Sequence, residues 1–140
     1  MGGEKSHAPL TPGNQRWMAE CREWVADAFE GADDYDTNPG TKLRVIEAVL
    51  AEVRPGETWK LQALGVVLGD AIGLAYGYPW VQVADGLDAV PALLLSEVPE
   101  PVYAYPVTMI SKRAEAGQTL DFVALVELAE NVAHAVGRRR

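Results

Sequence analysis

Four glycines spaced four residues apart constrain this chain more than any other feature. They occupy positions 65, 69, 73 and 77 of the stretch WKLQALGVVLGDAIGLAYGYPWVQVAD, which runs from Trp59 to Asp85. The residues between them are almost all apolar, so the stretch predicts a helix that is buried on nearly every side. Spacing of four places Gly65, Gly69 and Gly73 on one helix face. We expect that face to pack closely inside the protein, in preference to forming an open groove for a ligand or partner.

The same apolar run raises the alternative of a membrane-spanning helix. Its length from Leu61 to Val81 would suffice for a span. However, Asp70 lies in the middle, Gln62 lies near the start, and strand-like alternation begins at Trp80. We therefore predict a buried helix of a soluble domain. The helix should end at Gly77, which precedes a Tyr-Pro pair and suits a left-handed C-terminal cap.

Size and charge narrow the class of protein. The chain has 140 residues, is 49% hydrophobic, and carries 12 basic against 20 acidic residues, for a net charge of −8. These values favour one globular domain, argue against nucleic-acid binding, and are compatible with a basic protein partner. The lone Cys21 excludes an intramolecular disulfide and a thiolate metal cluster. With no secretory signal evident, we expect a cytoplasmic protein with no cofactor.

The remaining chain predicts an α+β fold. We expect a flexible tail over residues 1–10, a single domain over 11–137 and a basic tail over 138–140. Within the domain, N-terminal helices precede the buried glycine-rich helix, and a small antiparallel β-meander and C-terminal helices follow it. The first three helices are expected from Thr11-Pro12 to about 30, over 42–53 and over 57–76. The strands are expected over 80–84, 89–96 and 102–105. The last two helices are expected from Pro106 to 117 and from the N-cap Thr119 to 137.

Acidic residues crowd into one part of the chain. The first helix buries a stripe that includes its tryptophans, so its carboxylates should face solvent beside an acidic loop. We expect these residues to form a surface that steers a basic partner, together with the strand residues Trp80 and Asp85. The alternative is that the charge only keeps the protein in solution. The acidic residues predicted to contact a partner are Glu23, Asp27, Asp33, Asp34 and Asp36.

The sequence contains few residues that could form a catalytic or metal-binding motif. The acidic loop lacks the glycine and glutamate positions of a calcium-binding EF-hand, and His134 follows Glu130 on a helix face typical of solvent exposure. We therefore predict no metal site and no catalytic residue. Asp70 interrupts an apolar helix, where an unpaired carboxylate would be costly. It should either meet solvent at the helix edge or pair with Lys112 or Arg113.

Three segments together resemble a family of small bacterial domains whose function is unknown. They are LGVVLGDAIG, WVQVADG and YPVTMISKRAEAG, and they span about Leu61 to Gly117. The resemblance implies an α+β domain and carries no activity or catalytic residues. In size and charge alone, the chain is also similar to immunity proteins that neutralise secreted bacterial toxins.

Two functional hypotheses follow from these observations. The first is a non-enzymatic protein-binding domain, such as an immunity-type inhibitor of a basic bacterial toxin. The second is a small ligand-binding domain or hydrolase that uses the region of Asp70, Trp80 and Asp85. Neither nucleic acid nor a membrane is an expected partner, and the sequence does not determine the oligomeric state.

Overall fold

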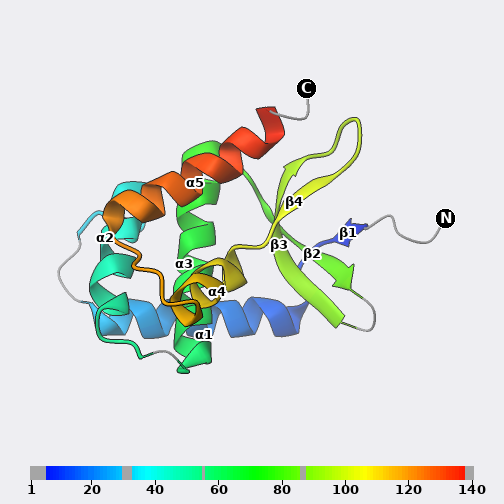
Figure 1. Ribbon diagram of the computed structural model, residues 1–140. Coiled ribbons are helices and arrows are strands. Elements are labelled where there is room, and N and C mark those ends of the chain that lie inside the picture. Colours follow the sequence, from blue (N-terminus) through cyan, green and yellow to red (C-terminus); the bar gives the residue numbers. More distant parts are fainter. Residues whose placement is uncertain (1–5, 30–32, 55, 86–87, 138–140) are drawn as a thin grey trace.

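A computed structural model describes residues 6–29, 33–54, 56–85 and 88–137. Helices gather at one end and a four-stranded antiparallel sheet at the other (Figure 1). The α+β class and the order of elements agree with the sequence prediction. The elements are β1 (His7–Ala8), α1 (Pro12–Ala28), α2 (Pro39–Leu50), α3 (Thr58–Tyr76), β2 (Trp80–Asp85), β3 (Asp88–Ser96), β4 (Val102–Ala104), the 3-10 helix η1 (Pro106–Thr108), α4 (Met109–Glu115) and α5 (Phe122–Gly137).

The glycine-rich helix α3 is the centre of the packing. Every residue from Ala63 to Gly69 is buried, and α1, α2, η1 and α4 all contact the helix. A Cβ on Gly65 would overlap the Val107 carbonyl of η1, and one on Gly73 would lie 2.8 Å from the Tyr78 carbonyl oxygen. The expected internal packing of the glycine face is thus confirmed. Among the described residues, none of the helices has the length and hydropathy that a membrane crossing requires.

Helix ends follow side-chain and glycine caps. The sequence predicted that α1 starts at Thr11-Pro12 and that α3 ends at Gly77, and both are confirmed. Thr11 caps α1 by accepting the Asn14 N–H at 3.1 Å, and Gly77 ends α3 with φ +78°. At α5 the predicted cap Thr119 is wrong. Asp121 accepts the Ala124 N–H at 2.9 Å instead, because the helix starts three residues after Thr119.

The sheet has the order β1-β2-β3-β4, so the predicted meander is present and gains one strand. His7 and Ala8 pair with Val83 and Gln82 of β2, which corrects the expected loose tail for these residues. Residues 1–5 and the basic tail 138–140 lie outside the described residues. Pro91 lies opposite Gln82, beyond the part of β3 that β4 covers, so its missing N–H costs no ladder hydrogen bond.

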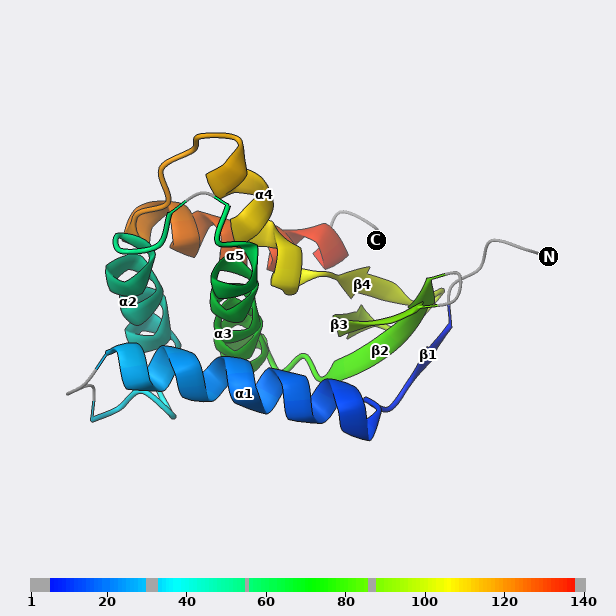
Figure 2. The same cartoon turned by 90° about the horizontal axis from the view of Figure 1, so that it is seen from below.

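The sheet presents different faces to two cores. Leu93, Leu95 and Ala104 face the helices and join the main core around α3. Val81, Val83 and Ala92 form a small second core on the opposite face. His7 on β1 hydrogen-bonds Tyr103 on β4 at 2.7 Å, across two intervening strands, so the sheet curls around this second core. Figure 2 shows α1 running past α2 and α3, with its N-terminal end beside the sheet.

Candidate functional site

Asp70 is held by an arginine that the sequence analysis did not single out. Arg22 of α1 donates from Nε to Oδ2 of Asp70 at 2.7 Å and from Nη2 to Oδ1 at 2.9 Å. The indole N–H of Trp80 donates to Oδ1 at 2.9 Å. This bidentate pair raises the pKa of Arg22 and ties together α1, α3 and the first residue of β2. Its role is therefore structural.

The predicted pairing of Asp70 with Lys112 or Arg113 is wrong. Arg113 donates to the backbone carbonyl of Met109 at 3.2 Å, one turn back on its own helix, and Lys112 is exposed. The reason is geometric, because α4 packs near the first half of α3, where Gly65 meets η1. Arg22 lies on α1, which crosses α3 nearer to Asp70.

Trp80, which we predicted to contact a partner, is half-buried in the structure. Its ring lies against Gly69, where a Cβ would overlap the indole. Its N–H is used by Asp70. Asp85 lies on β2, but its side chain is outside the described part of the structure. The predicted role of Trp80 and Asp85 in partner binding therefore stays a prediction.

The predicted acidic residues are all exposed, namely Glu23, Asp27, Asp33, Asp34 and Asp36. Asp34 has an additional local role. Its carboxylate accepts from Thr41 Oγ1 at 2.8 Å and from Asn38 Nδ2 at 3.0 Å, which holds the turn that starts α2. Tyr35 between these aspartates packs inward under Lys42, and burial raises its pKa to about 12. These contacts therefore hold the turn at Asp34 in place while its charge stays on the surface.

A groove with exposed aromatic rings lies between the C-terminal ends of α1 and α2 and the start of α3. Its volume is about 340 Å³, and its wall includes Trp24, Phe29, Val49 and Val53. Trp59 adjoins it, packed edge-to-face on Trp24 with ring centroids 5.1 Å apart. Trp59 is 54% exposed and Phe29 38% exposed. We call this surface the aromatic groove.

The charge around the aromatic groove is mostly negative. Glu52 lines it, and helical spacing places Glu20 and Asp27 one turn before and after Trp24. Within the described ranges these three carboxylates have no ion-pair partner. The groove's cation, Lys60, is paired with Glu57, and its hydrogen bond lowers the pKa of Glu57.

Sequence reasoning missed Trp59 and assumed that Trp24 was hidden. Trp24 lies at the edge of the buried stripe of α1, and Trp59 lies in the first turn of α3, where one side of the helix is not yet covered. Those two positions were the sequence features that could have indicated exposed tryptophans. Their contact depends on how α1 crosses α3, which a single-helix pattern does not contain.

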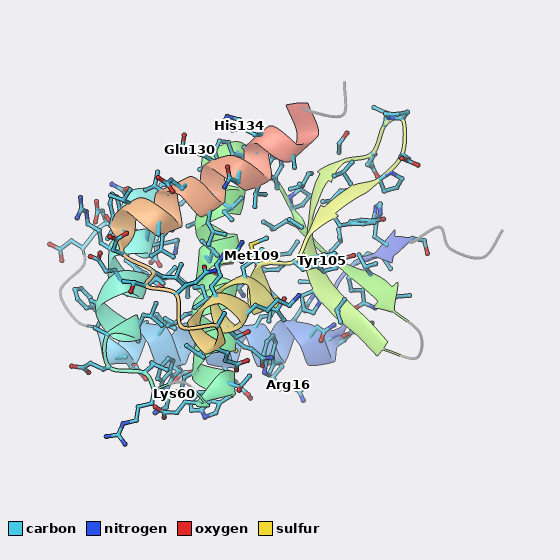
Figure 3. All side chains as sticks on the ribbon, viewed as in Figure 1. Arg16, Lys60, Tyr105, Met109, Glu130 and His134 are labelled. Carbon is cyan, nitrogen blue, oxygen red and sulfur yellow. The ribbon has the colours of Figure 1, made fainter. Side chains whose placement is uncertain are left out.

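No group of three or more His, Cys, Asp or Glu side chains among the described residues is arranged to hold a metal ion. Glu130 and His134 are exposed on α5 and point away from the rest of the molecule (Figure 3). Cys21 is buried, and burial raises the pKa of its thiol to about 11. These groups therefore form no reactive cluster.

Comparisons with known proteins identify relatives of the fold. The family model described as Domain of unknown function (DUF3806) matches residues 42–125. A crystal structure of a protein from Bacteroides thetaiotaomicron is similar, with a TM-score of 0.67 and 18% sequence identity. The similarity covers 91% of this chain but 47% of that one, so this chain spans about half its length. At this identity the likeness concerns the fold alone. A comparison with curated proteins gives no match.

Proposed function

The chain belongs to this family of domains of unknown function, and from that premise we propose that it is a non-enzymatic protein-binding domain. The aromatic groove is the proposed contact surface. The observation that carries the proposal is Trp59, which is 54% exposed although it packs on Trp24, a half-buried ring that contacts the core. Tryptophans in such positions are typical anchors of protein interfaces.

Charge supports a basic partner. The aromatic groove is flanked by Glu20, Asp27 and Glu52, on a chain with a net charge of −8. We propose a partner segment that inserts one apolar side chain into the groove and carries Lys or Arg beside it. The exposed aspartates of the loop add to the negative field, which raises the association rate more than the affinity. An immunity-type inhibitor that neutralises a basic toxin in the cytoplasm would have this chemistry.

The hydrolase hypothesis at Asp70 finds no support in the geometry. Both carboxylate oxygens accept hydrogen bonds, from Arg22 and from Trp80. A general base needs an oxygen that can approach a substrate proton. Three hydrogen bonds engage both oxygens of Asp70 in joining three elements of the fold.

The proposal can be tested by site-specific crosslinking in the native host. A photoreactive benzoylphenylalanine at position 59 should crosslink to one partner protein. The matched control places the same group at Val123, which is 62% exposed on α5 and does not line the groove. A partner captured from position 59 and not from position 123 would locate the interface.

The purified partner then allows a quantitative test. Trp59→Ala should weaken the affinity about tenfold or more, as for an interface anchor, whereas Val123→Ala should leave it unchanged. Asp27→Asn combined with Glu52→Gln should slow association at low salt, with an effect that fades as salt rises. A partner that binds equally well to the wild type and to Trp59→Ala would refute the aromatic groove as its contact surface.

A further inference from the structure

A second hollow lies at the N-terminal end of α1, beside the sheet. Its volume is about 540 Å³, and it is lined by residues of α1, α3, β3, η1 and α4. We call it the Lys112 cavity. Trp17, Val107 and Pro91 provide apolar wall, and Gln62, Thr108 and Lys112 provide polar groups. Figure 3 shows Tyr105, another lining residue, at the junction between the sheet and α4.

The fold keeps this hollow open for a physical reason. β4 pairs with β3 at Leu93, Leu94 and Ser96, so the earlier part of β3 has no neighbour on that side. Pro91 in this part has no N–H to offer to another strand. Asn14 of α1 instead donates to the Ala89 carbonyl at 3.2 Å, which holds the end of α1 against the uncovered strand. Because Asn14 also lines the hollow, this hydrogen bond fixes the position of one of its walls.

Three polar side chains of the cavity are not used by the fold. Within the part of the chain that the structure describes, the Gln62 amide, the Thr108 hydroxyl and the Lys112 ammonium make no hydrogen bond or ion pair. The neighbouring Arg113 differs, because its guanidinium binds the Met109 carbonyl. All three unused groups can donate hydrogen bonds, and they come from three different elements, α3, η1 and α4.

The charge of the lining is opposite to that of the chain. The protein has 20 acidic residues, yet none of the residues that line this cavity is Asp or Glu. Lys112 therefore gives the cavity a positive wall in a protein with a net charge of −8. One ammonium with neutral donors suits a carboxylate, since phosphate sites generally add a guanidinium fork or a glycine-rich backbone nest.

We propose that the Lys112 cavity binds a small organic acid. The carboxylate pairs with Lys112 and accepts hydrogen bonds from Thr108 and Gln62, and a flat apolar body lies against Trp17. The volume falls within the range of small-molecule sites, which are mainly apolar with a few polar groups that set orientation. This site is separate from the aromatic groove, so each proposal can fail without the other.

Two probes of equal shape test the proposal. Naphthalene-2-carboxylate and the neutral naphthalene-2-carboxamide are titrated into the full chain, with binding followed by protein NMR. The carboxylate should shift the Trp17 indole and Gln62 side-chain signals in a saturable manner, and the carboxamide should bind about tenfold or more weakly. Equal affinity of the two probes, shifts confined to other residues, or no saturable shift would overturn the proposal.

Two variants that each remove one positive charge test whether the carboxylate binds in the Lys112 cavity. Lys112→Gln should reduce carboxylate affinity to that of the carboxamide, and the exposed position of Lys112 makes a folding defect easy to exclude by thermal melting. Lys60→Gln removes the same charge at the aromatic groove and should leave the affinity unchanged, as should Trp59→Ala. An equal loss for Lys60→Gln and Lys112→Gln would show a non-specific charge effect and overturn the assignment.

Discussion

Trp80 donates its indole N–H to Asp70 at 2.9 Å while its ring lies on Gly69, the preceding residue of α3. The glycine provides the space for the ring, and the aspartate accepts the hydrogen bond from the indole N–H. Arg22 then neutralises the aspartate from α1. Two adjacent residues of one helix thus join the sheet and the first helix to the core.

Filling the space at Gly69 should destabilise the fold. Even the Cβ of Gly69→Ala would overlap the Trp80 ring, and Gly69→Leu would displace it altogether. We expect a loss of at least about 1–3 kcal/mol in the free energy of unfolding for Gly69→Leu, measured by chemical denaturation. Gly13→Ala in the exposed first turn of α1 is the control and should be nearly neutral. Equal stability of Gly69→Leu and wild type would contradict the packing described here.

The Arg22–Asp70 pair should show strong energetic coupling. The two side chains are 39% and 17% exposed, and their bidentate geometry distinguishes them from a surface pair worth about 0–1 kcal/mol. A double-mutant cycle with Arg22→Gln and Asp70→Asn should give a coupling energy above about 1 kcal/mol. The same cycle with Arg113→Gln should give almost none, since Arg113 binds Met109. Similar coupling in both cycles would argue against the observed pairing.

The two candidate caps of α5 should respond differently to alanine. Asp121 accepts the Ala124 N–H, so Asp121→Ala should cost about 0.5–2 kcal/mol of unfolding free energy. Thr119 is exposed and precedes the helix, so Thr119→Ala should change stability by less than about 0.5 kcal/mol. The comparison requires only equilibrium denaturation of the two variants. A larger effect at Thr119 would restore the cap that the sequence predicted.

Stability should fall in alkaline solution as Cys21 titrates. Burial raises the pKa of this thiol from the ordinary 9.0 to about 11, so the folded protein keeps a proton that the unfolded chain releases. The contribution to stability is complete below pH 9 and is lost as the pH rises toward 11. Unfolding free energies measured from pH 7 to 10.5 should therefore fall less steeply for Cys21→Ala than for the wild type. Parallel curves would show that the thiol has the same pKa in the folded and unfolded protein.

The sequence by itself determined the features that depend on local periodicity and capping. Apolar residues and glycines at helical spacing marked α3 as the buried centre, and Gly77 and Thr11 marked two helix ends. Alternating strands around a turn predicted the meander. For the candidate sites, the sequence identified exposed acidic residues and the unusual position of Asp70. A pattern of this kind specifies which side of a helix or strand is apolar.

Only the tertiary structure decided which side of each helix or strand packs against which other element. Asp70 pairs with Arg22, 48 residues away, because α1 crosses α3 at that level, while the predicted cations lie on α4 at another level. The same crossing places Trp24 against Trp59 and leaves the second ring exposed. Periodicity fixes the direction of a side chain relative to its own element. The angle and height at which two elements cross come from the packing of the whole core, and these set the partners.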